Sequence, residues 1–189
     1  MATVIREGKP GTILDIGAGL GLFTECAYRW GIQCIALEGS EFAVEETKKR
    51  VPELDMRLHY LDDPFPLQDN CIDTVLCFQT IEHLYPDTAL NVMKESYRVL
   101  KKGGVILLYS PSIYNKKELA EETHVNLYSP QRLRSELHDA GFRHIRSIDS
   151  PLNIIGKSKI ATIVTEVIFK AIPIDRLSAT ANCIAKKTL

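Results

Sequence analysis

The sequence lacks long apolar runs, an excess of one charge and a leader segment, and each absence excludes a class of protein. Its most extended apolar stretch, residues 160–172, is interrupted by Thr, Glu and Lys and is too short to span a bilayer. Lys and Arg number 23 against 24 Asp and Glu, so no basic surface predicts a nucleic-acid partner. Residues 1–11 are too short and polar for a signal peptide.

Cysteine is sparse and unpaired. The odd set shows no C-x-x-C and no spacing typical of a metal site: Cys26, Cys34, Cys71, Cys77 and Cys183. Such a set predicts reduced core thiols in the cytoplasm and no metal ligands. With 45% hydrophobic and 25% charged residues, the 189-residue chain is expected to form one soluble domain over residues 1–189.

Short apolar runs alternate with helical patterns, which is typical of an α/β fold with a parallel sheet between helices. The predicted strands are residues 12–16, 33–37, 56–60, 74–78, 105–109, 142–148 and 182–186. The predicted helices are residues 20–30, 41–50, 88–100 and 130–140, the last with Ser129 as N-cap. The helix of residues 88–100 is expected to end before the turn at Gly103 and Gly104.

The most informative stretch runs from Asp15 to Gly21, Asp-Ile-Gly-Ala-Gly-Leu-Gly, between the first strand and the first helix. Its glycines let a ligand approach the backbone, and the helix start offers free N–H groups and a positive dipole end. Leu22 stands where a dinucleotide-binding turn needs glycine or alanine. The Asp15 carboxylate would repel a pyrophosphate but suits a ligand with a cationic end.

A second acidic residue, Glu38, ends the next apolar strand, where open parallel sheets bind ligands. Its carboxylate can accept hydrogen bonds from both hydroxyls of a ribose, and Gly39 leaves room for the sugar. NAD-binding folds also use an acid at this place, so Glu38 alone leaves that alternative open.

Two further runs carry a resemblance to a known family. Residues 78–84, Phe-Gln-Thr-Ile-Glu-His-Leu, are similar to its "LEHL" signature, and residues 98–104 match its "R-x-L-K-P-G-G" turn with Lys102 in place of proline. From about residue 12 to about residue 148, the chain resembles class I S-adenosylmethionine-dependent methyltransferases of the type-11 group. The resemblance implies a Rossmann-like, doubly wound sheet of seven strands, mostly parallel with an antiparallel last strand.

The resemblance also implies roles for individual residues. Asp15 helps hold the methionine amino group, directly or through water, and Gly17, Ala18 and Gly19 lie against the ribose and methionyl part. Asp62, chosen over the adjacent Asp63, accepts from the adenine amino group. Phe78 and Gln79 lie beside the methionine moiety, and S-adenosylmethionine is the expected cofactor.

Methyl transfer from a sulfonium needs mainly alignment of the reacting atoms, with a base only for a protonated acceptor. His83 and His124 are the candidate catalytic bases. Glu82 and His83 are adjacent and are expected to point in different directions, which favours a role in ordering the loop over an acid–base pair. The expected acceptor is a small molecule with an O, N or C nucleophile, and no nucleic acid or membrane span is expected.

Residues 157–172 form a predicted amphipathic helix inserted before the last strand. Its apolar stripe is interpreted as an ordinary buried face, a cover over the acceptor pocket, the seam of a homodimer or a membrane-surface contact. Two other functions stay open beside methyl transfer: a non-catalytic relative that binds the cofactor or acts as a scaffold, and an NAD-dependent oxidoreductase.

Overall fold

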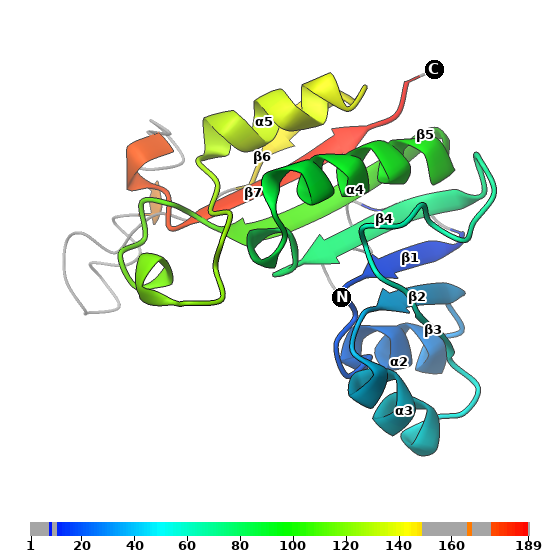
Figure 1. Ribbon diagram of the computed structural model, residues 1–189. Coiled ribbons are helices and arrows are strands. Elements are labelled where there is room, and N and C mark those ends of the chain that lie inside the picture. The colour runs from blue at the N-terminus through cyan, green and yellow to red at the C-terminus, as the bar shows by residue number, and fades with distance from the viewer. Residues whose placement is uncertain (1–7, 9–10, 149–165, 168–174, 189) are drawn as a thin grey trace.

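Seven strands form a single sheet in the order β3-β2-β1-β4-β5-β7-β6 (Figure 1). The computed structural model describes residues 8, 11–148, 166–167 and 175–188. The strands are β1 (Ile13–Ile16), β2 (Cys34–Glu38), β3 (Asp55–Leu58), β4 (Ile72–Phe78), β5 (Leu100–Pro111), β6 (Arg143–Ser147) and β7 (Thr180–Lys186). Strands β1 to β5 pair in parallel, and β7 pairs antiparallel with both β5 and β6. The predicted fold class and its antiparallel last strand are confirmed.

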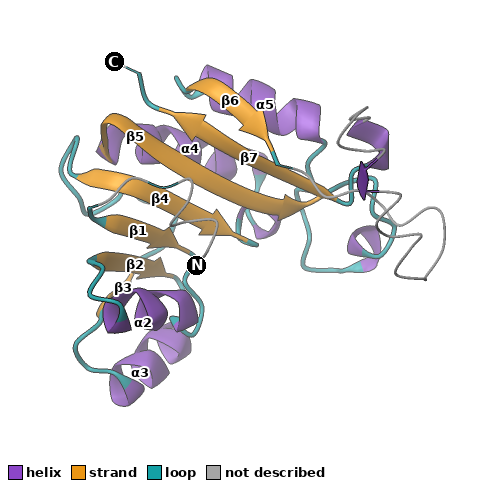
Figure 2. Ribbon diagram, turned by 180° about the vertical axis from the view of Figure 1, so that it is seen from behind, coloured by secondary structure: helices purple, strands orange, loops and turns teal. Residues whose placement is uncertain are grey.

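Helices lie on both faces of this sheet, as Figures 1 and 2 show from opposite sides. They are α2 (Leu22–Arg29), α3 (Glu41–Arg50), α4 (Pro86–Val99) and α5 (Pro130–Asp139), with short 3-10 helices η1 (Ile81–His83), η2 (Glu118–Ala120) and η3 (Asp175–Leu177). The predicted N-cap of α5 is present, since the Ser129 hydroxyl accepts from the Arg132 amide at 3.1 Å.

Alternation along the buried strands sends neighbouring side chains into different parts of the core. On β1, Leu14 packs into the cluster that includes residues of α4 and α5, whereas Ile13 joins the cluster that includes Ala27 of α2. On β4, Val75 joins the first cluster and Leu76 the second. This double burial explains why these strands read as continuous apolar runs.

Strand β5 is longer than predicted. Strand β5 begins at Leu100 rather than at residue 105, because Leu100 pairs with Ile72 and the chain stays in the strand through Gly103 and Gly104. The predicted helix of residues 157–172, and with it the dimer seam, lies outside the described residues except for 166–167. Among the residues that the structure describes, no helix is long and apolar enough to cross a bilayer.

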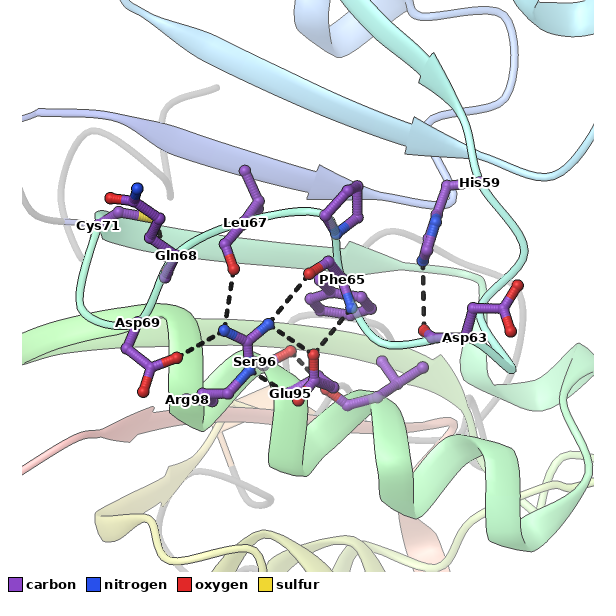
Figure 3. A network of polar contacts seen from close by, with 12 residues as sticks. His59, Asp63, Phe65, Leu67, Gln68, Asp69, Cys71, Glu95, Ser96 and Arg98 are labelled. Atoms are coloured by element: carbon purple, nitrogen blue, oxygen red, sulfur yellow. Dashed lines mark hydrogen bonds and ion pairs between the residues drawn. The ribbon is translucent and has the colours of Figure 1, made fainter.

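Arg98, at the end of α4, fixes the loop between β3 and β4 (Figure 3). Its guanidinium binds the carboxylates of Glu95 and Asp69 at 2.7 Å and donates to the carbonyls of Phe65 and Leu67 at 3.1 and 2.9 Å. The planar fork of an arginine suits several acceptors at once. This network holds in place the loop whose first residues reach the functional site.

Candidate functional site

The glycine turn after β1 is a tight left-handed turn. Gly17 has φ +68°, and a Cβ there would lie 2.4 Å from the Thr80 hydroxyl oxygen, so only glycine fits. Gly19 has φ +55°, and a Cβ there would meet nothing within 4 Å. Gly17 therefore serves the packing of the turn against Thr80, whereas Gly19 borders open space.

Glu38, at the end of β2, links this turn to the start of α3. One carboxylate oxygen accepts from the Gly19 amide at 2.7 Å and the other from the Ser40 amide at 2.8 Å. Two backbone donors thus fix the orientation of the carboxylate, and each oxygen keeps a second lone pair for a ligand hydroxyl.

A cavity of about 350 Å³ opens between the glycine turn, the end of β2 and the end of β4. Six of the predicted site residues line it: Gly17, Glu38, Gly39, Asp62, Gln79 and His83. The prediction did not include five other lining residues: Tyr60, Leu61, Thr80, Leu84 and Thr88. Four of these lie within two positions of a predicted site residue in the sequence, and this proximity could have pointed to them. Thr88 comes from the first turn of α4 and carried no such signal.

The structure distinguishes the two adjacent aspartates. Asp62 lines the cavity and its carboxylate accepts from the Thr88 hydroxyl at 2.5 Å. Asp63 is exposed, is absent from the lining, and its carbonyl lies 3.3 Å from a ring nitrogen of His59 (Figure 3). Gln79 has φ +53°, a conformation that costs free energy for a residue with a Cβ, and it borders the cavity.

Asp15, Ala18, Gly19 and Phe78 do not line the cavity. Asp15 is 4% exposed, and its carboxylate accepts from the Thr24 hydroxyl at 2.8 Å. Burial raises the pKa of Asp15 to about 6. The ring of Phe78 packs edge-on against Phe23 and Tyr109, with centroids 6.3 and 4.5 Å away. The roles given to these four residues stay predictions.

The two candidate bases lie side by side, and a third residue joins them. The ring centroids of His83 and His124 are 5.0 Å apart. A ligand atom of each histidine and of Glu82 all lie within 4.8 Å of one another. The expectation that Glu82 and His83 point apart was therefore wrong. The tight turn of η1 and the loop that carries His124 bring the three residues together. The backbone N–H of Asn126 in this loop donates to the Glu82 carbonyl at 3.1 Å.

The Glu82 side chain is fully buried, and no described residue gives either carboxylate oxygen a well-formed hydrogen bond. Burial raises the pKa of its carboxyl group, and weaker hydrogen bonding from its own backbone N–H and the Ser110 hydroxyl opposes the rise together with the nearby His83 and His124 rings. Of the three, His83 lines the cavity. The cluster thus adjoins the cavity through His83.

Comparison with known proteins agrees with this geometry. A family model described as a methyltransferase domain matches residues 14–108, half of the chain. The chain belongs to the class I S-adenosylmethionine-dependent methyltransferases. A solved structure described as a SAM-dependent methyltransferase from Archaeoglobus fulgidus superposes with TM-score 0.75 at 21% identity, covering 98% of this chain and 92% of that one.

Two curated proteins are similar in sequence. One, named "Probable S-adenosylmethionine-dependent methyltransferase" of Mycolicibacterium smegmatis, is 33% identical over 100 residues, 53% of this chain and 38% of that protein. The other, a ubiquinone biosynthesis O-methyltransferase of Xanthomonas campestris, is 31% identical over 108 residues, 54% of this chain and 44% of that protein. The matched region thus spans less than half the length of either relative.

The cavity fits the cosubstrate of this family. S-adenosylmethionine has a sulfonium and an ammonium group, a ribose diol and an adenine amino group, all of which call for acceptors or negative charge. The lining supplies the carboxylates of Glu38 and Asp62 and the amide of Gln79, beside the open turn at Gly19. Leu22, which stands where a dinucleotide-binding turn needs glycine or alanine, disfavours NAD.

Proposed function

We propose that this chain transfers a methyl group from S-adenosylmethionine to a small-molecule acceptor. The observation that carries the proposal is the cavity in which Glu38 and Asp62 face the end of β4 next to the glycine turn. Bound S-adenosylmethionine supplies an electrophilic methyl group: the acceptor's nucleophilic atom bonds to the methyl carbon as the carbon–sulfur bond breaks and its electron pair goes to sulfur.

Each lining residue has a place in this proposal. Glu38, already oriented by two amides, accepts from the ribose hydroxyls, and Asp62 accepts from the adenine amino group. Gln79 lies toward the methionine end, and Asp15 acts behind the turn through water. The chain's contribution to rate is then mostly alignment of the acceptor with the methyl group, which needs no nucleophilic side chain.

The acceptor is proposed to be a small molecule with an O, N or C nucleophile. Support comes from the balanced charge of the chain and the small-molecule pathway in the printed name of one relative. The five cysteines are free, in agreement with the proposed cytoplasmic location.

Calorimetric titration of the purified chain with S-adenosylmethionine, S-adenosylhomocysteine and NAD tests the cofactor. We expect micromolar binding of the first two at one molecule per chain and no heat with NAD. Binding of NAD alone would make the chain an oxidoreductase, and binding without turnover in a screen of acceptors would favour the non-catalytic relative.

Glu38→Ala sharpens this test, with Glu45→Ala on the exposed side of α3 as the matched control. Removing a charged acceptor of two hydrogen bonds costs about 1.5–3 kcal/mol, so affinity should fall about 10- to 100-fold. Adenosine should lose affinity together with S-adenosylmethionine. A loss that spares adenosine would place Glu38 at the methionine end instead.

A further inference from the structure

Glu82, His83 and His124 form a cluster that methyl transfer by alignment does not use. It joins η1, which follows β4, to the loop that precedes α5. The ligand atoms of the three side chains lie within 4.8 Å of one another. Ligands that share one Zn²⁺ or Mn²⁺ at about 2.0–2.2 Å lie about 3–4 Å apart, so side-chain adjustments that shorten the separations by at most about 2 Å would close the site.

Both histidines are anchored at one ring nitrogen. Nδ1 of His83 lies 3.1 Å from the Thr123 carbonyl oxygen, and Nδ1 of His124 lies 3.1 Å from the Glu118 carbonyl oxygen. A carbonyl only accepts, so each Nδ1–H is the donor, and Nε2 is the ring nitrogen that remains for a ligand. Metal-binding histidines are oriented in this way by a hydrogen bond from the second ring nitrogen.

Glu82 provides an independent observation. Its side chain is fully buried, and no described residue gives either carboxylate oxygen a well-formed hydrogen bond; only its own backbone N–H and the Ser110 hydroxyl lie close enough to lower its pKa. A buried carboxylate with such weak partners is costly, and an ion at the site is one of the ordinary explanations for such a group. Asp15, by contrast, is a buried carboxylate that accepts a hydrogen bond from the Thr24 hydroxyl at 2.8 Å.

We propose that Glu82, His83 and His124 bind one divalent transition-metal ion, Zn²⁺ or Mn²⁺. Two imidazoles and one carboxylate suit these ions, whereas Mg²⁺ and Ca²⁺ prefer oxygen ligands alone. Three protein ligands leave at least one coordination position open.

The position of the cluster suggests what the open coordination site takes. Since His83 also lines the cavity proposed for S-adenosylmethionine, we place the open position toward its methyl group and the acceptor that approaches it. The cation would then hold an oxygen of the acceptor and lower the pKa of a hydroxyl bound to it. This role rests on the proposed function, and it narrows the acceptor to a molecule that presents an oxygen to the metal. The binding of the ion does not depend on it.

The test measures metal binding directly. The purified chain is first freed of metal with a chelator. It is then titrated with Mn²⁺, with free Mn²⁺ measured by electron paramagnetic resonance. A separate titration with Zn²⁺ is measured by calorimetry. We expect one ion per chain. His83→Ala, at an exposed position where folding should not suffer, and His124→Ala should each weaken binding at least about tenfold.

Two further variants complete the set. Glu82→Gln keeps the shape of the side chain and removes its charge, and it should weaken binding as well, with circular dichroism to confirm folding. His138→Ala removes an exposed histidine of α5 and should bind like the wild type. The inference fails if neither ion binds at one per chain, or if the variants of His83 and His124 bind as well as His138→Ala.

Titration with S-adenosylmethionine in the presence of chelator separates the two proposals. Binding of S-adenosylmethionine without stoichiometric metal binding would refute the metal site and leave the proposed function standing. The opposite result is a chain that binds one metal ion through the two histidines but does not bind S-adenosylmethionine. It would refute the proposed function and leave the metal site standing.

Discussion

The Asp15 carboxyl should make this protein less stable as the pH rises. Burial is the main cause that raises its pKa from 3.8 to about 6; the hydroxyl of Thr24 opposes the rise and the charge of Glu38 adds to it. The native state therefore holds the proton more tightly than the unfolded chain. The resulting stabilisation is fully present below pH 3.8 and is lost as the pH rises through about 6.

The size of the effect follows from the two pKa values. A rise from 3.8 to about 6 is equivalent to about 3 kcal/mol. Asp15→Asn keeps the shape of the side chain and removes its ionisation. The free energy of unfolding of the wild type, minus that of Asp15→Asn, should fall by about 2–3 kcal/mol between about pH 4 and about pH 7. Other titrating groups are common to both proteins and cancel in the difference.

Urea unfolding followed by circular dichroism, repeated across this pH range, measures the difference. Thr24→Val provides a matched second variant: it removes the hydroxyl that donates to Asp15 at 2.8 Å and that lowers the pKa of the carboxyl. In Thr24→Val, the pH-dependent loss of stability caused by Asp15 should extend to higher pH than in the wild type. A difference between wild type and Asp15→Asn that stays constant across the range would show that Asp15 ionises as an ordinary aspartate.

Three further changes test the packing and the site. Arg98→Ala removes the anchor of the β3–β4 loop and should lower the free energy of unfolding by about 1–3 kcal/mol in denaturant unfolding. An unchanged unfolding midpoint would show that the network does not stabilise the fold. Gly17→Ala should destabilise by more than the about 1–2 kcal/mol expected of Gly19→Ala, because its Cβ also meets Thr80, and equal losses would contradict that reasoning. Asp62→Ala should weaken S-adenosylmethionine about 3- to 10-fold in calorimetry, with Asp63→Ala as control, and the opposite ranking would reverse the assignment.

Much of the fold could be predicted because the sheet is buried on both faces. Strands hidden from water on two sides must be continuously apolar, so β1, β2 and β4 were visible as short apolar runs. The boundary of β5 could not be predicted from such a run. Its first residue, Leu100, is held by pairing with Ile72 of β4, ahead of a register shift, and only the partner strand specifies that.

The cofactor side of the site could also be predicted, since parallel strands end at the same edge of a sheet. That rule placed the glycine turn, Glu38 and Gln79 around a single cavity. It could not place Thr88, which reaches the cavity from a helix, nor show that Asp15 is turned away toward Thr24. The direction of a single side chain at a strand end depends on what packs above it.

By itself, the sequence determined the α/β alternation, the family and the ligand-facing turn after β1, because these depend on local backbone preferences and on burial patterns a few residues long. Only the tertiary structure decided that Glu82, His83 and His124 meet. Their meeting depends on a loop of the chain packing against η1, with the Asn126 amide bound to the Glu82 carbonyl. Contacts between segments so distant in sequence are set by the packing of the whole domain, which no local pattern encodes.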